Sequence, residues 1–240
     1  MAKSTFNISI GPNTKLQSGI GNPEAVLNRA SQLWSTFPQS KETKIFAFSY
    51  PDLSWAQQKV RDLATRKNIV LVFDECTSGF RETFGGIFNK YGVEPDMVMF
   101  GKTIGNGYAL TAVVGKKSVM EAAQTSFISS TCWTERIGPT AALATLKVME
   151  DIKSWEIITK KGKKVQEGWK TLALSNGLEI DVAGIPALST YSFKSEHALA
   201  YKTLVTQEML KKNILASTNF YASIAHEDEF IDRYFEELDK

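Results

Sequence analysis

The sequence predicts an α/β fold, in which a layer of parallel strands is followed by a smaller α+β region. The main indication is the run IVLVF at 69–73, which is apolar at every position and therefore typical of a strand buried on both faces. Two further apolar runs follow, MVMFG at 97–101 and TAVVG at 111–115. Buried strands that are separated by helices indicate a parallel sheet covered on both sides.

The first elements can be placed along the chain from local signals. Residues 1 to about 26 are rich in Gly, Pro, Asn and Ser, which favours an irregular arm. The run KIFAFSY at 44–50 predicts a strand, and Ser54 with Gln57 forms a capping-box pair that predicts the start of a helix. Asn68 is a residue type that commonly ends a helix.

The second half of the chain shows a different order of elements. Pro139 is expected to start a long helix or a helix pair, with an apolar face that includes Leu143 and Met149. The stretch LEIDVAGIPALSTYSF indicates two strands around a turn, and helices are expected over 196–212 and 227–240. The last of these helices is expected to carry one apolar stripe, formed by Ile231, Tyr234, Phe235 and Leu238. These elements predict an arm at 1–43, a large domain at 44–165 and a small carboxy-terminal α+β domain at 166–240.

Composition limits the classes of function. The 240 residues are 43% hydrophobic and 22% charged, with a formal net charge of +2. Basic residues are scattered among acidic ones, which argues against nucleic acid or a membrane as partner and favours a small-molecule substrate. Because the amino terminus has no apolar signal region and no apolar run is long enough for a membrane span, we expect a cytoplasmic protein.

The most informative polar residues follow the predicted buried strands. Asp74 and Glu75 come directly after IVLVF, and Lys102 comes after MVMFG. In an open α/β sheet, ligands bind at the carboxyl ends of the strands. An acid and a lysine are therefore expected at the ends of two strands that could be neighbours. Taken singly, each could equally be a capping or solvated loop residue.

One chemistry with these ingredients is nucleotide hydrolysis, with VLVFDE as a Walker B strand and GKT at 101–103 as the end of a phosphate-binding loop. The spacing argues against it, since Asp96 stands where that loop requires its first glycine. The order is also reversed, because the lysine loop should precede the acidic strand.

The other chemistry is that of pyridoxal 5'-phosphate (PLP). It requires a lysine amine that binds the cofactor aldehyde as a Schiff base, and a carboxylate that keeps the pyridine nitrogen protonated. Lys102 and Asp74 are of these two types. When the substrate amine displaces the lysine, the free amine can move a proton at the substrate's α carbon.

The stretch LVFDECTSGFRETFGGIFNKYGVEPDMVMFGKTIGNGYALTAVVGK at 71–116 closely resembles the signature of the class III PLP-dependent aminotransferases, in its glutamate-1-semialdehyde aminomutase-like form. The resemblance implies the type I fold of PLP-dependent transferases, with Lys102 as the Schiff-base lysine and Asp74 as the partner of the ring nitrogen. It also implies amino transfer, or 1,2-amino migration, on an amino-acid-like or amino-aldehyde substrate.

The resemblance assigns further positions. Thr131, in SSTCWTERIG, matches the family threonine that contacts the PLP phosphate across a dimer interface, which implies a homodimer. Cys76 stands where the family usually has the valine that packs on the ring face; a cysteine there can pack as a small apolar group. The stretch YKTLVTQEMLKKNILAS at 201–217 is similar to the family's small domain.

The chain also departs from the family pattern. TERIG replaces the commoner Gly-Gly-Asn-Pro sequence after the threonine, and the family's Gly-Ser/Thr phosphate loop and stacking aromatic are not recognisable before residue 44. Because FNISIGPNT at 6–14 is similar to the amino-terminal arm of these enzymes, the comparison implies an internal deletion that leaves a reduced large domain. The alternative to an active enzyme is a non-catalytic relative that keeps the fold and dimer surface but binds PLP poorly.

Overall fold

The computed structural model describes residues 45–48, 54–126, 132 and 134–240, with side chains described from residue 58 onward. The expected arm at 1–43 lies outside these residues. The described chain divides into two compact units. The first contains the residues up to Gly79 and those of Gly86–Leu143, and the second contains Phe80–Gly85 and Ala144–Lys240.

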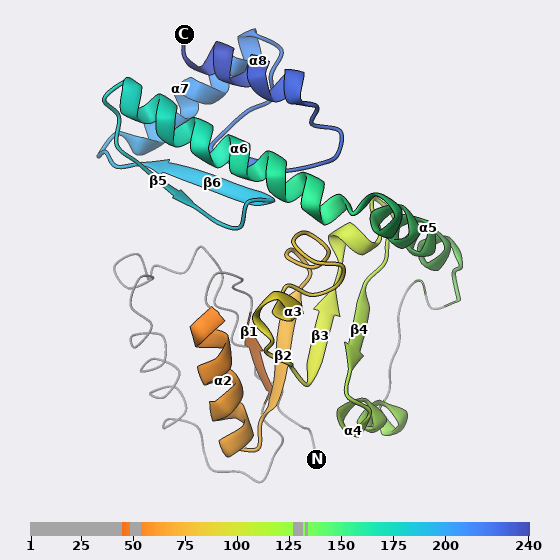
Figure 1. Ribbon diagram of the computed structural model, residues 1–240. Helices are drawn as coiled ribbons and strands as arrows, with labels where there is room; N and C mark the ends of the chain where they lie inside the picture. The colour runs from red at the N-terminus through yellow and green to blue at the C-terminus, as the bar shows by residue number, and fades with distance from the viewer. Residues whose placement is uncertain (1–44, 49–53, 127–131, 133) are drawn as a thin grey trace. The chain divides into compact units, whose positions relative to one another are not determined.

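The first unit is built on a four-stranded sheet with the order β1-β2-β3-β4 (Figure 1). Strands β1, β2 and β3 are parallel, whereas β4 is antiparallel to β3. The four strands are Ile45–Phe48, Val70–Glu75, Met97–Phe100 and Ala112–Gly115. The predicted strands at 44–50, 69–73 and 97–101 are therefore confirmed, and so is the α/β class.

The prediction that the run at 111–115 is a buried parallel strand was wrong. β4 runs antiparallel to β3, and Val113 and Val114 are 48% and 49% exposed. The connection between the two strands holds only a 3-10 turn, η1 (Lys102–Ile104), and contains no α-helix. Without a crossover helix the chain returns along the same sheet, which gives an antiparallel neighbour.

Helix α2 (Ser54–Arg66) covers one part of this sheet. Its buried residues Val60 and Ala64 form a core with Leu71 and Phe73 of β2. The helix ends as predicted at Asn68, which has a left-handed φ of 53°. The Ile69 N–H donates to the Ala64 carbonyl at 2.8 Å, a bond that satisfies one of the last helical carbonyls.

Short elements complete the first unit. Helix α3 (Phe88–Tyr91) packs on the core beside β2. Helix α4 (Lys117–Met120) and the 3-10 helix η2 (Glu121–Thr125) follow β4.

Two helices follow in direct succession, as the sequence predicts. Helix α5 (Ile137–Ile152) includes Pro139 in its first turn, where a missing N–H is tolerated. Lys153 then adopts a φ of 49° and separates α5 from the 22-residue helix α6 (Ser154–Ser175). The predicted boundary between domains at 165 and 166 falls inside α6, so that assignment stays a prediction.

The second unit contains a three-stranded antiparallel sheet, β5-β6-β7. Strands β5 (Ile180–Ala183) and β6 (Leu188–Phe193) form the predicted pair. The third strand, β7 (Asn219–Tyr221), has only three residues, and the sequence did not predict it. Helices α7 (Ala198–Lys211) and α8 (Asp228–Leu238) match the two expected helices.

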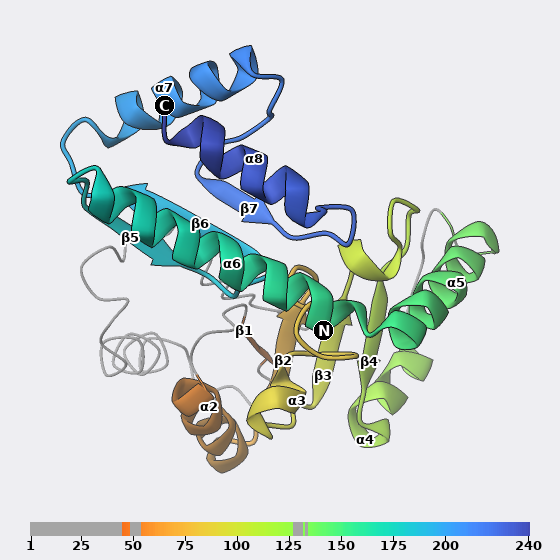
Figure 2. The ribbon, with the colours of Figure 1, turned by 45° about the horizontal axis from the view of Figure 1, so that its top comes forward.

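Helix α6 lies across this sheet, with α8 beside it (Figure 2). The core between them contains Trp169, Tyr191 and Ile231, with Tyr234 and Phe235 packed against it. The predicted apolar stripe of the last helix is therefore confirmed. A Cβ at Gly162 of α6 would overlap the Pro186 carbonyl oxygen, so this glycine allows the close approach of helix and turn.

In the part of the chain that the structure describes, none of the helices has the length and apolar character that crossing a bilayer requires.

Candidate active site

The polar residues singled out by the sequence lie at the carboxyl ends of two adjacent parallel strands. β2 ends with Asp74 and Glu75, which pair in register with Met99 and Phe100 of β3. Gly101 and Lys102 follow β3 directly. The structure therefore brings Asp74 and Lys102 to the same edge of the sheet, which is where open α/β sheets bind ligands.

The Asp74 side chain is half-buried. Its Oδ1 accepts a hydrogen bond from the backbone N–H of Cys76, at 3.0 Å. The Cys76 thiol also hydrogen-bonds to this carboxylate, so Cys76 holds the Asp74 side chain at the end of its own strand.

Lys102 is held in an uncommon backbone conformation. Its φ of 45° lies in the left-handed region, which costs free energy in a residue with a Cβ. The turn is fixed by the N–H of Asn106, which donates to the Lys102 carbonyl at 3.0 Å. The side chain is exposed, and its Nζ donates to the Thr77 Oγ1 at 2.5 Å.

Cys76 lies between these two residues. Its Sγ would be 3.2 Å from a Cβ placed on Gly101, so the thiol packs against the backbone that carries Lys102. Burial raises the pKa of the Cys76 thiol, the Asp74 carboxylate raises it further, and the Lys102 charge opposes both. The thiol thus stays protonated and acts as a small packing group, as its position in the sequence predicts.

Glu75, although it is next to Asp74, has hydrogen-bond partners within the protein and a structural role. It is 3% exposed, and its carboxylate accepts the Ser78 hydroxyl at 2.6 Å and the Phe88 N–H at 3.2 Å. Burial raises the pKa of Glu75, and these hydrogen bonds oppose the rise. Glu75 therefore ties the loop after β2 to the start of α3, and does not face a ligand.

Of the four predicted site residues, the structure brings together Asp74, Cys76 and Lys102. Thr131 lies outside the described residues. Thr77, which accepts the hydrogen bond from Lys102, was missed by the sequence analysis. Its position two residues after the end of β2 was the available signal, because side chains just beyond a strand end share that edge of the sheet.

This arrangement contains the two groups that PLP requires of a protein near its ring. A half-buried carboxylate suits the protonated pyridine nitrogen, and an exposed lysine amine suits the aldehyde. The described residues of this edge therefore include the two groups that would hold the ring and the aldehyde of PLP.

The comparisons with known proteins agree with this geometry. A family model described as Aminotransferase class-III matches residues 50–217. A 3-aminobutyryl-CoA aminotransferase of Cloacimonas acidaminovorans is 33% identical over 178 residues, which are 72% of this chain and 43% of the relative. A glutamate-1-semialdehyde 2,1-aminomutase of Bdellovibrio bacteriovorus is 27% identical over 194 residues, which are 73% of this chain and 46% of the relative.

Solved structures show the same fold. An omega-transaminase from Sphaerobacter thermophilus superposes with a TM-score of 0.75 at 18% identity, covering 92% of this chain and 59% of the other. A β-phenylalanine aminotransferase from Variovorax paradoxus gives 0.73 at 20% identity, with 91% and 55% covered. The chain thus spans about half the length of the proteins it matches. On the strength of the family match, this chain belongs to the class III aminotransferase family.

Proposed function

We propose that this chain takes part in PLP-dependent amino transfer or 1,2-amino migration on an amino-acid-like or amino-aldehyde substrate. The observation that carries the proposal is the placement of the Asp74 carboxylate and the Lys102 amine at the ends of adjacent parallel strands. The names of the relatives, an aminotransferase and an aminomutase, support both reaction types equally.

The proposal gives each residue a role. PLP, when bound, supplies an electron-withdrawing ring that stabilises negative charge on the substrate carbon. Asp74 would hold the proton on the ring nitrogen, and Lys102 would bind the aldehyde and later move the substrate's α proton. Cys76 would pack on the ring, and Thr131 would bind the phosphate.

Thr77 would orient the lysine. Its hydroxyl accepts the Lys102 Nζ–H, so it would hold the amine at the strand edge whenever that amine is not joined to the cofactor.

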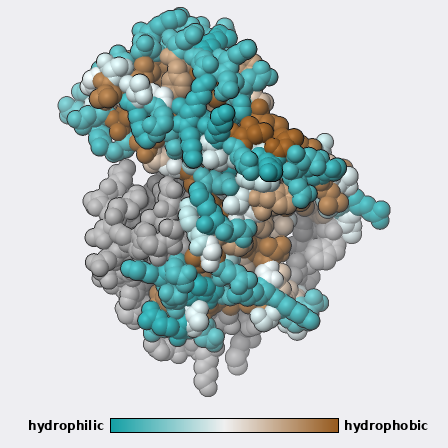
Figure 3. Space-filling view, in the orientation of Figure 1, coloured by the Kyte–Doolittle hydropathy of each residue, from teal (hydrophilic) through white to brown (hydrophobic). Residues whose placement is uncertain are grey.

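We also propose that the chain acts as a homodimer. Helix α5 supports this, because its predicted apolar face is only partly covered: Met149 is buried, but Leu143 and Ile152 are 71% and 40% exposed. Hydrophobic residues reach the surface over α5 in Figure 3. Apolar side chains gathered in this way are common where a second subunit packs.

A second candidate function is that of a non-catalytic relative that keeps the fold and the dimer surface. The sequence before β1 contains no recognisable Gly-Ser/Thr phosphate loop. In that family the loop's backbone N–H groups are expected to hold the phosphate. A chain that relies on Thr131 alone would bind PLP weakly.

The experiment is an absorbance spectrum of the purified chain with added PLP. We expect a visible band from the lysine-bound cofactor in the parent and none in Lys102→Ala. The matched control is Lys116→Ala, since Lys116 lies at the other end of the same sheet and pairs with Asp96; it should keep the band. A parent without a band at saturating PLP would overturn the enzyme proposal in favour of the non-catalytic relative.

A further inference from the structure

The second unit contains a cavity whose lining includes none of the residues proposed for the PLP chemistry. It has a volume of about 390 Å³ and lies between α6, α8, β7 and the segment before β7. All of its lining residues fall between Val165 and Tyr234, so they belong to the second unit alone. The volume is within the usual range for pockets that bind one small molecule.

Aromatic rings form much of the cavity wall. Trp169, Phe220 and Phe230 line it, together with the aliphatic side chains of Ile214 and Ile231. Phe230 is 56% exposed, so a large apolar group is in contact with water at this site. A ligand with one flat ring would bury that surface.

Two polar side chains of the lining, Tyr234 and His226, can donate hydrogen bonds into the cavity. Tyr234 accepts the indole N–H of Trp169 at 2.8 Å, and among the described residues the structure shows no acceptor for the tyrosine's own proton. His226 Nδ1 accepts the N–H of Ser223 at 3.0 Å, so the neutral imidazole carries its proton on Nε2. Both side chains can therefore donate to a ligand.

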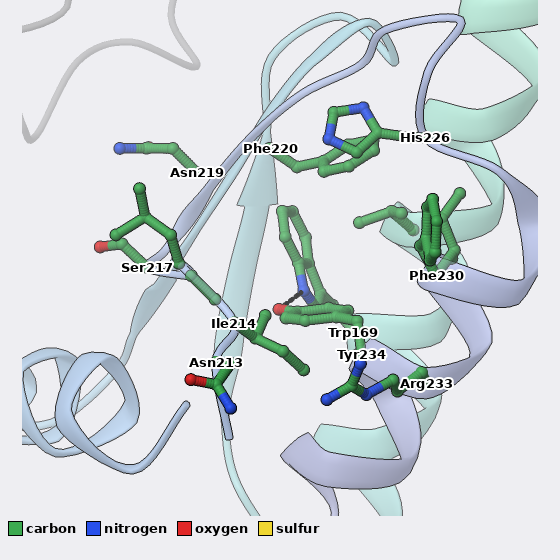
Figure 4. A pocket seen from close by; sticks show the side chains of 14 residues that line it. Trp169, Asn213, Ile214, Ser217, Asn219, Phe220, His226, Phe230, Arg233 and Tyr234 are labelled. Atoms are coloured by element: carbon green, nitrogen blue, oxygen red, sulfur yellow. Dashed lines mark hydrogen bonds between the residues drawn. The ribbon is translucent and has the colours of Figure 1, made fainter. Parts of the chain in front are cut away.

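The charge of the lining has one sign. Arg233 contributes a guanidinium, and no Asp or Glu is among the lining residues. One amino nitrogen of Arg233 donates to the Lys212 carbonyl at 3.0 Å, which fixes the side chain and leaves further N–H groups. Figure 4 shows Arg233 and Asn213 at the same end of the cavity.

Among the described residues, the structure shows no ion pair between Arg233 and an acid of α8. Asp228 and Asp232 pair with Lys164 of α6, at 3.4 and 2.6 Å, and Glu237 pairs with Lys212 and Lys240, at 3.3 and 2.9 Å. The guanidinium is therefore available to an external anion.

We propose that this cavity binds a small aromatic carboxylate, with its ring among Trp169, Phe220 and Phe230 and its carboxylate at the end where Arg233 and Asn213 lie. Aromatic walls alone would accept any apolar ring. The Arg233 cation and the two donors favour a ligand that carries an anionic acceptor. None of the residues proposed for the PLP chemistry lines the cavity, so the proposal holds whether or not the chain binds PLP.

The test is calorimetric titration of the full 240-residue chain with phenylacetate as the probe. We expect saturable binding at one site per chain. Phenylacetamide, which has the ring without the charge, and acetate, which has the charge without the ring, should both bind much more weakly.

Variants locate the site. Arg233→Gln should weaken phenylacetate binding about tenfold or more, as expected for loss of a charge-assisted hydrogen bond. Tyr234→Phe keeps the ring in the core and should weaken binding less. Arg136→Gln removes an exposed arginine outside the cavity and should bind like the parent, as should Lys102→Ala.

Several results would overturn the proposal. These are a parent that releases no binding heat with phenylacetate, equal affinity for phenylacetate and phenylacetamide, or a loss of binding in Lys102→Ala. The last result would mean that phenylacetate binds at Lys102 and not in this cavity.

Discussion

Each end of the first sheet contains an acid and a lysine, but the two ends differ in how these side chains are hydrogen-bonded. At the amino end, Asp96 accepts hydrogen bonds from Arg61 at 2.7 Å, from Lys116 at 3.3 Å and from the Leu71 N–H at 2.9 Å. At the carboxyl end, Asp74 accepts bonds from the N–H and the thiol of Cys76. Lys102 there has Thr77 as its hydrogen-bond partner. Only at the amino end are the acid and the lysine paired with each other, as Asp96 and Lys116.

The difference teaches how structural and ligand-binding polar groups can be told apart. The side chains of Arg61 and Asp96 are only 16% and 15% exposed, so their mutual hydrogen bonds offset the cost of removing them from water. Burial alone would raise the pKa of Asp96, but the bonds from Leu71 and Arg61 outweigh it and lower that pKa. In the described part of the chain, the carboxyl end keeps an exposed Lys102 amine and an Asp74 carboxylate that is paired with no cation, as a site for an external molecule requires.

The largest effect that separates the two ends is on stability. Asp96→Asn should lower the free energy of unfolding by about 3 kcal/mol, because it leaves Arg61 without its charge partner in a largely buried place. The matched variant Asp74→Asn should cost about 1 kcal/mol or less, since it weakens one hydrogen bond. Urea denaturation at neutral pH measures both, and equal losses would remove the proposed distinction.

The Asp96 carboxylate at the amino end of the sheet should also make stability depend on pH. The Asp96 pKa is lowered in the folded chain, so its contribution is present above the unfolded value of about 3.9. It is lost as the pH falls through the folded value. Denaturation from neutral to acidic pH should show this loss in the parent, and Asp96→Asn should lack it.

Glu75 should behave in the opposite way. Its pKa is raised by burial, so the folded chain holds its proton more tightly and stability falls as the pH rises above about 4.3, the unfolded value. Glu75→Gln can keep the bonds to Ser78 and Phe88 but does not titrate. The same denaturation series should therefore give a flatter profile in this variant, and an unchanged profile would contradict the buried position of Glu75.

A smaller effect is expected at Thr77. Thr77→Val removes the acceptor for Lys102 Nζ while keeping the shape of the side chain, and should slow the formation of the visible band about threefold, since one exposed hydrogen bond contributes little to the placement of the amine. Thr77→Ser is the control that keeps the hydroxyl. The rate at which the band appears after PLP is added measures both, and identical rates for all three chains would show that Thr77 does not orient the lysine.

The smallest effect should come from Cys76→Val, which introduces the residue that the family usually has. The protonated thiol packs against Gly101 and makes a weak hydrogen bond to Asp74, so stability should change by less than about 1 kcal/mol and the band should persist. A lost band in this variant would give the thiol a direct role in binding.

Much of the fold could be predicted from the sequence because its strands and helices carry strong local patterns. The all-apolar run of β2, the Asn68 helix end and the stripe of α8 each needed only neighbouring residues. The direction of β4 could not be read in this way, because it depends on the connection from β3 and not on the strand. β7 was missed because three residues are too few to show an alternation.

The site was predictable to the same degree. Asp74 and Lys102 were placed correctly because strand ends define an edge of the sheet. The bond from the Phe88 N–H to Glu75 depends on the path of the loop between them, and the cavity of the second unit depends on packing between α6, α8 and β7. Neither leaves a pattern in local sequence.

The most direct test of the central claim is to identify the lysine that binds the cofactor. The chain is incubated with PLP, the carbon–nitrogen bond is reduced with borohydride, and the labelled peptide is found by mass spectrometry. The account predicts the label on Lys102 and none on Lys116, the lysine engaged at the opposite end of the sheet. A label on Lys116, or spread evenly over surface lysines, would contradict it.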